Sequence, residues 1–205
     1  NIIIYQMVRL IKGGKELKMS KREGVFITLE ELIKEVGLDA ARYFFLMHAV
    51  GSHMDFDLDL AKERSKKNPV YYVQYAHARA CSILKKTGGE EKRKFSSIGL
   101  AVGTLMYSKI KAGEENFFFP ERHLILKLIQ FPEIIEDIAK DYQAHRLTTY
   151  AHELAKTFTD FYENVRVLNA ETDELKKSRL ALVFASRKIL EKNLSLMGIS
   201  APEKM

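Results

Sequence analysis

Three cations gather within five residues near the start of the chain, in the segment Lys18-Met19-Ser20-Lys21-Arg22. The segment is polar and Gly24 follows closely, so we expect an exposed loop. Lysine ammonium groups act as mobile point charges on phosphate oxygens, and the Ser20 hydroxyl can donate a hydrogen bond to the same group. Such donors help most where negative charge develops during phosphoryl or adenylyl transfer. A solvated lysine-rich turn explains the segment equally well, because short motifs often match by chance.

A second group of residues with binding chemistry lies on the helix expected from Pro69. One side of this helix carries aromatic, polar or small side chains with an arginine at its edge, namely Tyr71, Gln74, Tyr75, Ala78, Ser82 and Arg79. Aromatic rings can stack on unpaired RNA bases, while an arginine can meet a phosphate or a base plane. The competing interpretation is that the tyrosines pack against a neighbouring helix with their hydroxyls hydrogen-bonded, which is the commoner use of an aromatic stripe.

The alternating aspartates of the segment Asp55–Asp59 suggest a calcium loop, but the pattern fails. Leu60 replaces the glycine that such a loop requires, and Lys66 stands where its bidentate glutamate should be. Asp57 or Asp59 is better explained as a helix cap after an extended, apolar-anchored strap. The six histidines show no metal-ligand spacing, so we predict no protein-bound metal.

The first 27 residues differ from the rest of the chain. Their apolar, β-leaning run 7–11 is followed by a Gly13-Gly14 turn signal. The segment is too small to form a core of its own. We therefore expect it to be the remnant of an α/β domain whose main body is missing.

From Thr28 onward the signals are helical. Thr28 with Glu31 three residues later predicts a capping box, and Asp39 is expected to cap the following helix. Asn68-Pro69 predicts the start of a helix that runs to about residue 87. Two apolar stripes mark later helices, namely Leu154, Phe158, Phe161, Val165 and Leu168, and Leu182, Ile189, Leu190, Leu194 and Met197 before Gly198. The predicted fold is a mostly α helical bundle with a small β-containing appendage.

Composition bounds the class of protein. With 46% hydrophobic and 29% charged residues in a chain of 205, the sequence is typical of a soluble globular protein. No stretch approaches the ~20 apolar residues that a membrane helix needs. A single cysteine, Cys81, fits a reducing, cytoplasmic setting, and its place beside Ala80 on a helix predicts an inert buried thiol. The net charge of +6 favours a polyanionic partner, above all a nucleic acid. Because the chain starts at Asn1 without a methionine, we expect a piece of a longer protein.

Several blocks resemble, in the same order, those of class I arginyl-tRNA synthetases of the bacterial type. They are Gln6–Leu10, Lys18–Gly24, Thr28–Leu32, Asp39–Leu46, Asp55–Ala61, Asn68–Arg79 and Leu196–Met205. The resemblance is close over residues 6–80 and moderate over 145–205, and nothing is inferred from it for residues 88–119. Blocks in one order at both ends argue against chance.

This resemblance implies a domain organisation and a set of roles. Residues 1–27 would be the end of the class I catalytic domain, and residues 28–205 the α-helical anticodon-binding domain named for the Asp39–Arg42 motif. Lys18 and Lys21 would contact the ATP phosphates and stabilise the transition state of arginine activation, in a loop formed with Met19, Ser20 and Arg22. ATP would bring Mg²⁺, and L-arginine would bind to the missing part. The chain alone is therefore not expected to aminoacylate.

The same resemblance implies that arginine-accepting tRNA binds through its anticodon arm. The residues expected to contact it are Tyr71, Gln74, Tyr75, Arg79, Tyr162, Arg166 and Met205. Packing within the bundle stays open as the alternative for Tyr162. Arg42 stays open between a contact with RNA and an ion pair inside the bundle.

Three rival functions remain. The chain could be a stand-alone tRNA-binding module, although a pure binder has no use for the Lys18–Lys21 loop. It could be the same region of a synthetase for another amino acid such as cysteine, although the Asn68–Arg79 block favours arginine. A helical interaction protein is the third option. We expect a monomer, since no coiled-coil seam is present.

Overall fold

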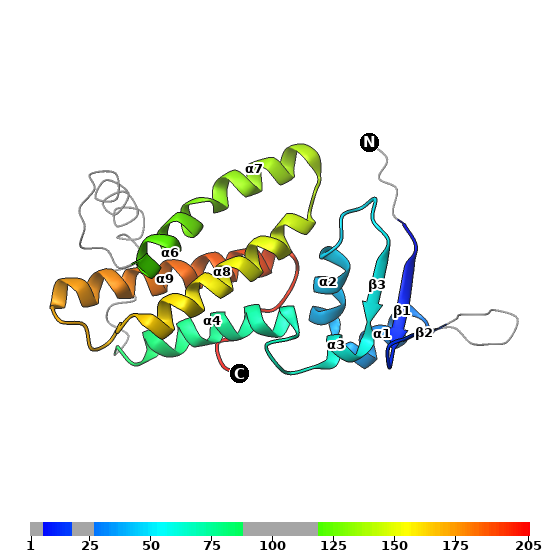
Figure 1. The fold of residues 1–205 in the computed structure, drawn as a ribbon, viewed down its shortest axis with the longest axis horizontal. Coiled ribbons are helices and arrows are strands. Elements are labelled where there is room, and N and C mark those ends of the chain that lie inside the picture. The colour runs from blue at the N-terminus through cyan, green and yellow to red at the C-terminus, as the bar shows by residue number, and fades with distance from the viewer. Residues whose placement is uncertain (1–5, 18–26, 88–118) are drawn as a thin grey trace, which may run out of the picture.

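The computed structural model describes residues 6–17, 27–87 and 119–205, so the predicted ATP loop, Lys18 to Arg22, lies outside the described residues. A helical bundle lies beside a smaller lobe built on a sheet (Figure 1). The elements are β1 (Val8–Lys12), β2 (Lys15–Glu16), α1 (Leu29–Val36), α2 (Leu38–Leu46), β3 (Met54–Asp57), α3 (Leu58–Lys62), α4 (Pro69–Lys85), α6 (Phe119–Ile129), α7 (Phe131–Asp141), α8 (His145–Asn164) and α9 (Asp173–Leu196). The mostly α fold with a small β part is confirmed.

The sheet has the strand order β2-β1-β3. The predicted turn at Gly13-Gly14 is confirmed and joins β1 and β2 in a hairpin, because these residues have φ of 59° and 73°, which glycine adopts without strain. β1 also pairs in parallel with β3, which aligns Val8 with Met54 and Leu10 with Phe56. The sheet thus joins strands from both sides of residue 28. The division into residues 1–27 and 28–205 stays a prediction.

Local capping fixes where the helices of the small lobe and α4 begin. The Thr28 hydroxyl accepts from the Glu31 amide while the Glu31 carboxylate accepts from the Thr28 amide, which confirms the capping box of α1. Asp57 caps α3, and the Asn68 side chain caps α4 ahead of its proline, as the sequence predicts. The prediction for Asp39 is wrong. Gly37, at φ 86°, ends α1 and begins α2 at once, so Asp39 already lies within α2.

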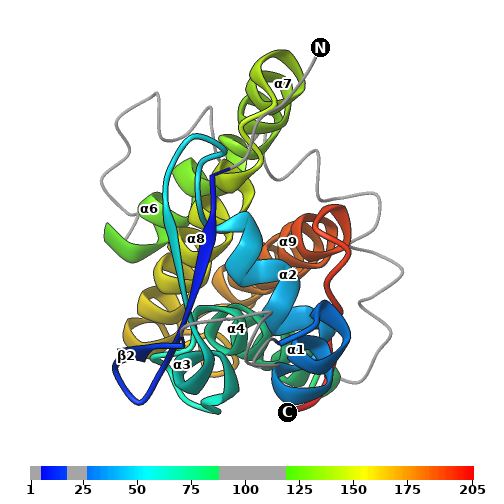
Figure 2. The same ribbon diagram turned by 90° about the vertical axis from the view of Figure 1, so that its right-hand side faces the viewer.

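The core of the bundle lies where α4, α6, α8 and α9 meet, as Figures 1 and 2 show. The two predicted apolar stripes on α8 and α9 face this core. Phe158, Phe161 and Leu190 are at most 1% exposed. Burial of such side chains contributes about 1.5–3 kcal/mol each relative to exposure, and the same core cluster continues into the small lobe through Phe56 and Leu58.

One ion pair lies inside the bundle and fixes the loop after α8. Arg179 of α9 donates from Nε to Glu121 of α6 at 2.7 Å, and both side chains are at most 9% exposed. Its Nη1 also donates to the Arg166 carbonyl at 3.1 Å. The loop that follows α8 is therefore connected through Arg179 to both α9 and α6.

No helix in the described part of the chain is long and apolar enough to cross a membrane.

Candidate nucleic-acid interface

Helix α4 separates an apolar side from a polar one. Val73, Ala80 and Ile83 are buried against the bundle, whereas Tyr75, Arg79 and Ser82 are exposed. This confirms the two sides that the helical spacing predicts, with one correction. Ala78 was expected on the polar side, and it is buried at 7% exposure.

Four side chains form a continuous stack on the exposed side, with Tyr162 joining from α8. The Tyr71 and Tyr75 rings are stacked, with centroids 6.4 Å apart and an interplanar angle of 16°. The Arg79 guanidinium lies 5.7 Å from the Tyr75 ring centroid and 4.4 Å from that of Tyr162. Both contacts lie within the ~6 Å range of a cation–π interaction. The arginine is held between two rings, so its plane and its position are set before any ligand arrives.

A cavity of about 500 Å³ opens beside this stack, between the second half of α4 and the end of α8. Its lining includes the stack members Arg79 and Tyr162, the exposed cations Lys86 and Arg166, and the polar residues Ser82, Asn164 and Asn169. A smaller hollow of about 50 Å³ follows the groove between Tyr72, Tyr75 and Tyr162 on the other flank of the stack. Aromatic faces, amides and cations around one opening are suited to a nucleobase with its phosphate.

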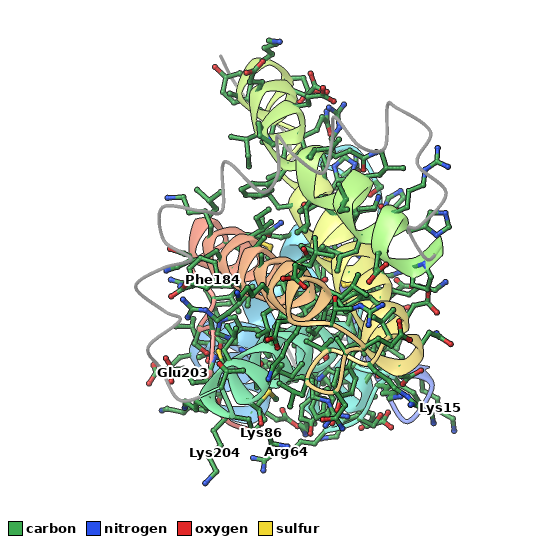
Figure 3. The ribbon with its side chains drawn as sticks, turned by 90° about the vertical axis from the view of Figure 1, so that its left-hand side faces the viewer. Lys15, Arg64, Lys86, Phe184, Glu203 and Lys204 are labelled. Carbon is green, nitrogen blue, oxygen red and sulfur yellow. The ribbon has the colours of Figure 1, made fainter. Side chains whose placement is uncertain are left out.

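Lys86 is a functional candidate that the sequence analysis missed. It lies seven residues after Arg79, which brings it to the same side of α4, so helical spacing alone was sufficient to find it. Figure 3 shows Lys86 projecting from the same edge of the molecule as Arg64 and Lys204. None of these three side chains, nor Arg79 or Arg166, has a carboxylate partner within the described residues.

Gln74 and Met205 lie apart from the stack. The Gln74 amide group donates to Asp39 Oδ2 at 2.9 Å and to the Ser200 carbonyl at 3.0 Å, so it connects α4 to α2 and to the end of the chain. Met205, the last residue of the segment that follows α9, is 48% exposed. Arg42 is exposed, donates to the Gly198 carbonyl and has no carboxylate partner within the described residues, while its contact with RNA stays a prediction.

Behind the stack, α4 carries a buried histidine and the single cysteine. His77 is 1% exposed, and its Nδ1 lies 2.9 Å from the Pro202 carbonyl. Burial lowers the pKa of His77, which favours the neutral ring. Burial raises the pKa of the Cys81 thiol, so it forms less of the reactive thiolate than an exposed cysteine does. Within residues 6–17, 27–87 and 119–205, no cluster of His, Cys, Asp or Glu could hold a metal ion.

A helical bundle with an aromatic and cationic face is suited to binding single-stranded RNA. The family model described as "DALR anticodon binding domain" matches residues 73–205, and the chain belongs to this family. Over its whole length the chain is also homologous to arginine–tRNA ligases. It is 45% identical over 205 residues to "Arginine--tRNA ligase 1" of Halalkalibacterium halodurans. It is 48% identical over 202 residues to "Arginine--tRNA ligase 2" of Bacillus thuringiensis subsp. konkukian.

Solved structures give the same result at lower identity. A putative arginyl-tRNA synthetase from Campylobacter jejuni superimposes with a TM-score of 0.78 at 27% identity, covering 98% of this chain and 40% of that one. The Thermus thermophilus arginyl-tRNA synthetase does so with a TM-score of 0.63 at 29% identity, covering 90% of this chain and 29% of that one. The chain spans 34% of the length of the curated relatives it matches, so it corresponds to one portion of such an enzyme.

Proposed function

We propose that this chain binds the anticodon arm of arginine-accepting tRNA through the face formed by Tyr71, Tyr75, Arg79 and Tyr162, as one part of an arginyl-tRNA synthetase. The observation that carries the proposal is the preformed stack of Arg79 between two tyrosine rings at the mouth of a 500 Å³ cavity. A cation–π stack at the surface contributes about 0.5–1 kcal/mol to folding, which is little for three large side chains of which two, Tyr75 and Arg79, are exposed. Binding of a ligand that stacks on these side chains would give them a function besides stabilising the fold.

The stack supplies the part of binding that recognises unpaired bases. Each base placed on an aromatic ring contributes about 1–3 kcal/mol by alanine substitution. Tyr75 is 37% exposed, so part of its ring is accessible to such a base, and the N–H groups at the edge of the Arg79 guanidinium can meet a phosphate. Since these groups are already in place, little side-chain entropy is lost when RNA binds.

Cations around the cavity supply the part of binding that depends on phosphate. Lys86 and Arg166 stand on opposite walls of the cavity, and both are exposed. They would follow the backbone of a looped strand while bases enter the hollow. The proposed RNA contacts also include Met205 and the side-chain carbonyl oxygen of Gln74. This electrostatic part should weaken with added salt, because phosphate contacts release counterions.

In the whole enzyme, we propose that the loop from Lys18 to Arg22 contacts the phosphates of Mg²⁺-bound ATP during arginine activation. Lys21→Ala in the full-length enzyme should then lower the rate of ATP–pyrophosphate exchange by about 10²-fold, the scale expected for loss of one charge-stabilising donor. Its tRNA affinity should stay unchanged. An unaltered exchange rate would remove the catalytic role of this lysine. We further propose that the enzyme acts as a monomer in the cytoplasm.

The tRNA-binding proposal is tested by gel-shift titration of this chain with arginine tRNA and with a tRNA for another amino acid. We expect weak, salt-sensitive binding that favours arginine tRNA and is reduced by Tyr75→Ala and by Arg79→Ala. Equal binding by the wild-type chain and by both variants would eliminate the assignment of this face.

A further inference from the structure

The segment after α9 turns sharply and then follows α4. Gly198, at φ 66°, follows the last residues of the helix, and its amide donates to the Ser195 carbonyl while the Ile199 amide donates to the Leu194 carbonyl. These two bonds form a Schellman motif, which needs a left-handed residue at Gly198. Ile199 is buried at 4% exposure. The chain therefore leaves α9 in a fixed direction.

Two residues of α2 hold this segment from one side. The Asp39 carboxylate accepts from the Ser200 amide at 3.1 Å, from the Ser200 hydroxyl, and from Gln74 Nε2 at 2.9 Å. One helical turn further along α2, Arg42 donates to the Gly198 carbonyl. Asp39 and Arg42 thus bind backbone groups of two residues of the segment, Ser200 and Gly198, and Asp39 also binds the Gln74 side chain of α4.

Helix α4 holds the segment from the other side, at positions that share one stripe. Gln74 donates to the Ser200 carbonyl, His77 Nδ1 lies 2.9 Å from the Pro202 carbonyl, and Lys85 pairs with Glu203 at 2.9 Å. The segment therefore runs along α4 towards the end that carries Lys86. Figure 3 shows Lys204 and Lys86 projecting from the same edge of the molecule.

Glycine at position 198 fits the approach of Arg42 as well as the turn. A Cβ at this position would lie 2.6 Å from Arg42 Nη1, which is too close for a non-bonded contact. A side chain there would both strain the left-handed backbone and displace the guanidinium.

From these contacts we infer that Asp39 and Arg42 are positioning residues, which hold segment 198–205 along α4 so that Lys204 and Met205 take part in RNA binding. The inference rests on the proposed tRNA-binding function. It links the small lobe to α4, which carries the proposed RNA-binding face, because α2 belongs to the small lobe and Glu203 of the segment pairs with Lys85 of α4. The bonds from the Ser200 amide to Asp39 and from Arg42 to the Gly198 carbonyl involve backbone groups, so these two bonds hold the path of the segment independently of its side chains.

The test compares Asp39→Ala with Glu30→Ala in this chain. Both acids occupy the second position of a helix in the small lobe, but among the described residues Glu30 pairs only with the exposed Lys34. Removing either acid makes the chain more basic, which by itself strengthens RNA binding. We expect Asp39→Ala to weaken arginine tRNA binding roughly three- to tenfold at fixed salt, the scale of one or two lost hydrogen bonds. Glu30→Ala should bind as tightly as the wild-type chain or more tightly.

Amide hydrogen exchange supplies a readout that is independent of RNA. In Asp39→Ala the Ser200 amide should exchange at least about tenfold faster, while amides in the middle of α8 keep their rates. If Asp39→Ala does not fold, Ser200→Ala removes one bond to the same carboxylate without any change of charge, and a smaller loss of affinity is expected.

The possible outcomes separate the two proposals. Folded Asp39→Ala that binds tRNA as tightly as Glu30→Ala would overturn the positioning role. Unchanged exchange at Ser200 would overturn the hydrogen-bonded path itself. Failure of the wild-type chain to bind tRNA would overturn the proposed function and the RNA part of this inference, while the exchange rates would still decide whether Asp39 holds the segment.

Discussion

Two groups of tyrosines in this molecule have the same side chain and opposite surroundings. Tyr43 and Tyr150 are 1% and 2% exposed, and their hydroxyls donate to the carbonyls of Thr148 and Lys127 at 2.9 and 3.0 Å. Tyr75 is 37% exposed, and its hydroxyl has no partner within the described residues. A packing role explains the first group completely.

The exposed group shows what packing leaves unexplained. The Tyr71 ring stacks on Tyr75, and Arg79 lies over the rings of Tyr75 and Tyr162. Tyr75 is exposed, whereas Tyr71 and Tyr162 are half-buried and Tyr162 also packs against the core. Packing with a hydrogen-bonded hydroxyl is thus realised by Tyr43 and Tyr150, while base stacking by the Tyr75 group stays a proposal. Variants of the two groups should accordingly fail in different ways, the buried ones in stability and the exposed ones in binding.

Tyr150→Ala should produce the largest effect. It removes a buried ring that stacks on Phe131 and leaves the Lys127 carbonyl without its donor, so the free energy of unfolding should fall by about 3–5 kcal/mol. Denaturation by urea measures this directly. Tyr75→Ala should cost less than about 1 kcal/mol in the same assay. A similar loss of unfolding free energy in both variants would contradict the distinction between buried and exposed tyrosines.

Tyr75→Ala should instead weaken binding of arginine tRNA by about tenfold, which corresponds to about 1.4 kcal/mol of lost base stacking. Fluorescence anisotropy at fixed salt measures this affinity. The matched control is Tyr142→Ala, since Tyr142 is 55% exposed at the end of α7, away from the stack. Equal losses in the two variants would mean that tRNA does not use the stack.

The next prediction is that high pH lowers the stability that the buried tyrosines contribute. Burial raises the pKa of Tyr43 and of Tyr150 above the ordinary value of about 10, so both keep their protons in the folded state when the unfolded chain begins to lose them. The stabilising contribution is complete below about pH 10 and falls as the pH rises further, by up to about 1.4 kcal/mol per tyrosine at pH 11. Tyr43→Phe should flatten this decline in urea titrations from pH 9 to 11. Tyr75→Phe serves as the control for loss of an exposed hydroxyl, and an equally steep decline in both variants would contradict the assignment.

Arg166→Ala should have the smallest effect. Arg166 is exposed at the rim of the cavity, and only its backbone carbonyl is tied to the bundle, through Arg179. We expect a uniform loss of about two- to threefold for all tRNAs and a salt dependence reduced by about one phosphate contact. Affinities measured across a range of salt concentrations test this, and a loss confined to arginine tRNA would instead assign Arg166 to base recognition.

Local signals in the sequence account for much of the fold. The caps at Thr28 and Asn68, the turn at Gly13-Gly14 and the stop at Gly198 each depend on the conformational preference of a few adjacent residues, and all four are confirmed. Two features depended on partners far along the chain. The parallel pairing of β1 with β3 and the contacts of Asp39 with Ser200 join residues 46 and 161 positions apart.

The candidate site was predictable in part for the same reason. Tyr71, Tyr75 and Arg79 follow from the spacing of one helix. The sandwich of Arg79 by Tyr162 requires the packing of α4 on α8, which no helical wheel contains. Gln74 shares the helical side of the stack but turns to Asp39, because a carboxylate lies within reach on α2.

The most direct measurement is photo-crosslinking to arginine tRNA with p-benzoylphenylalanine in place of Tyr75, compared with the same residue in place of Tyr142. If the stack binds the anticodon arm, position 75 should crosslink to nucleotides of the anticodon loop, and unlabelled arginine tRNA should compete. Position 142 should give little product. Crosslinks from position 75 to the acceptor stem, or equal yields at both positions, would contradict the assignment of this face to the anticodon.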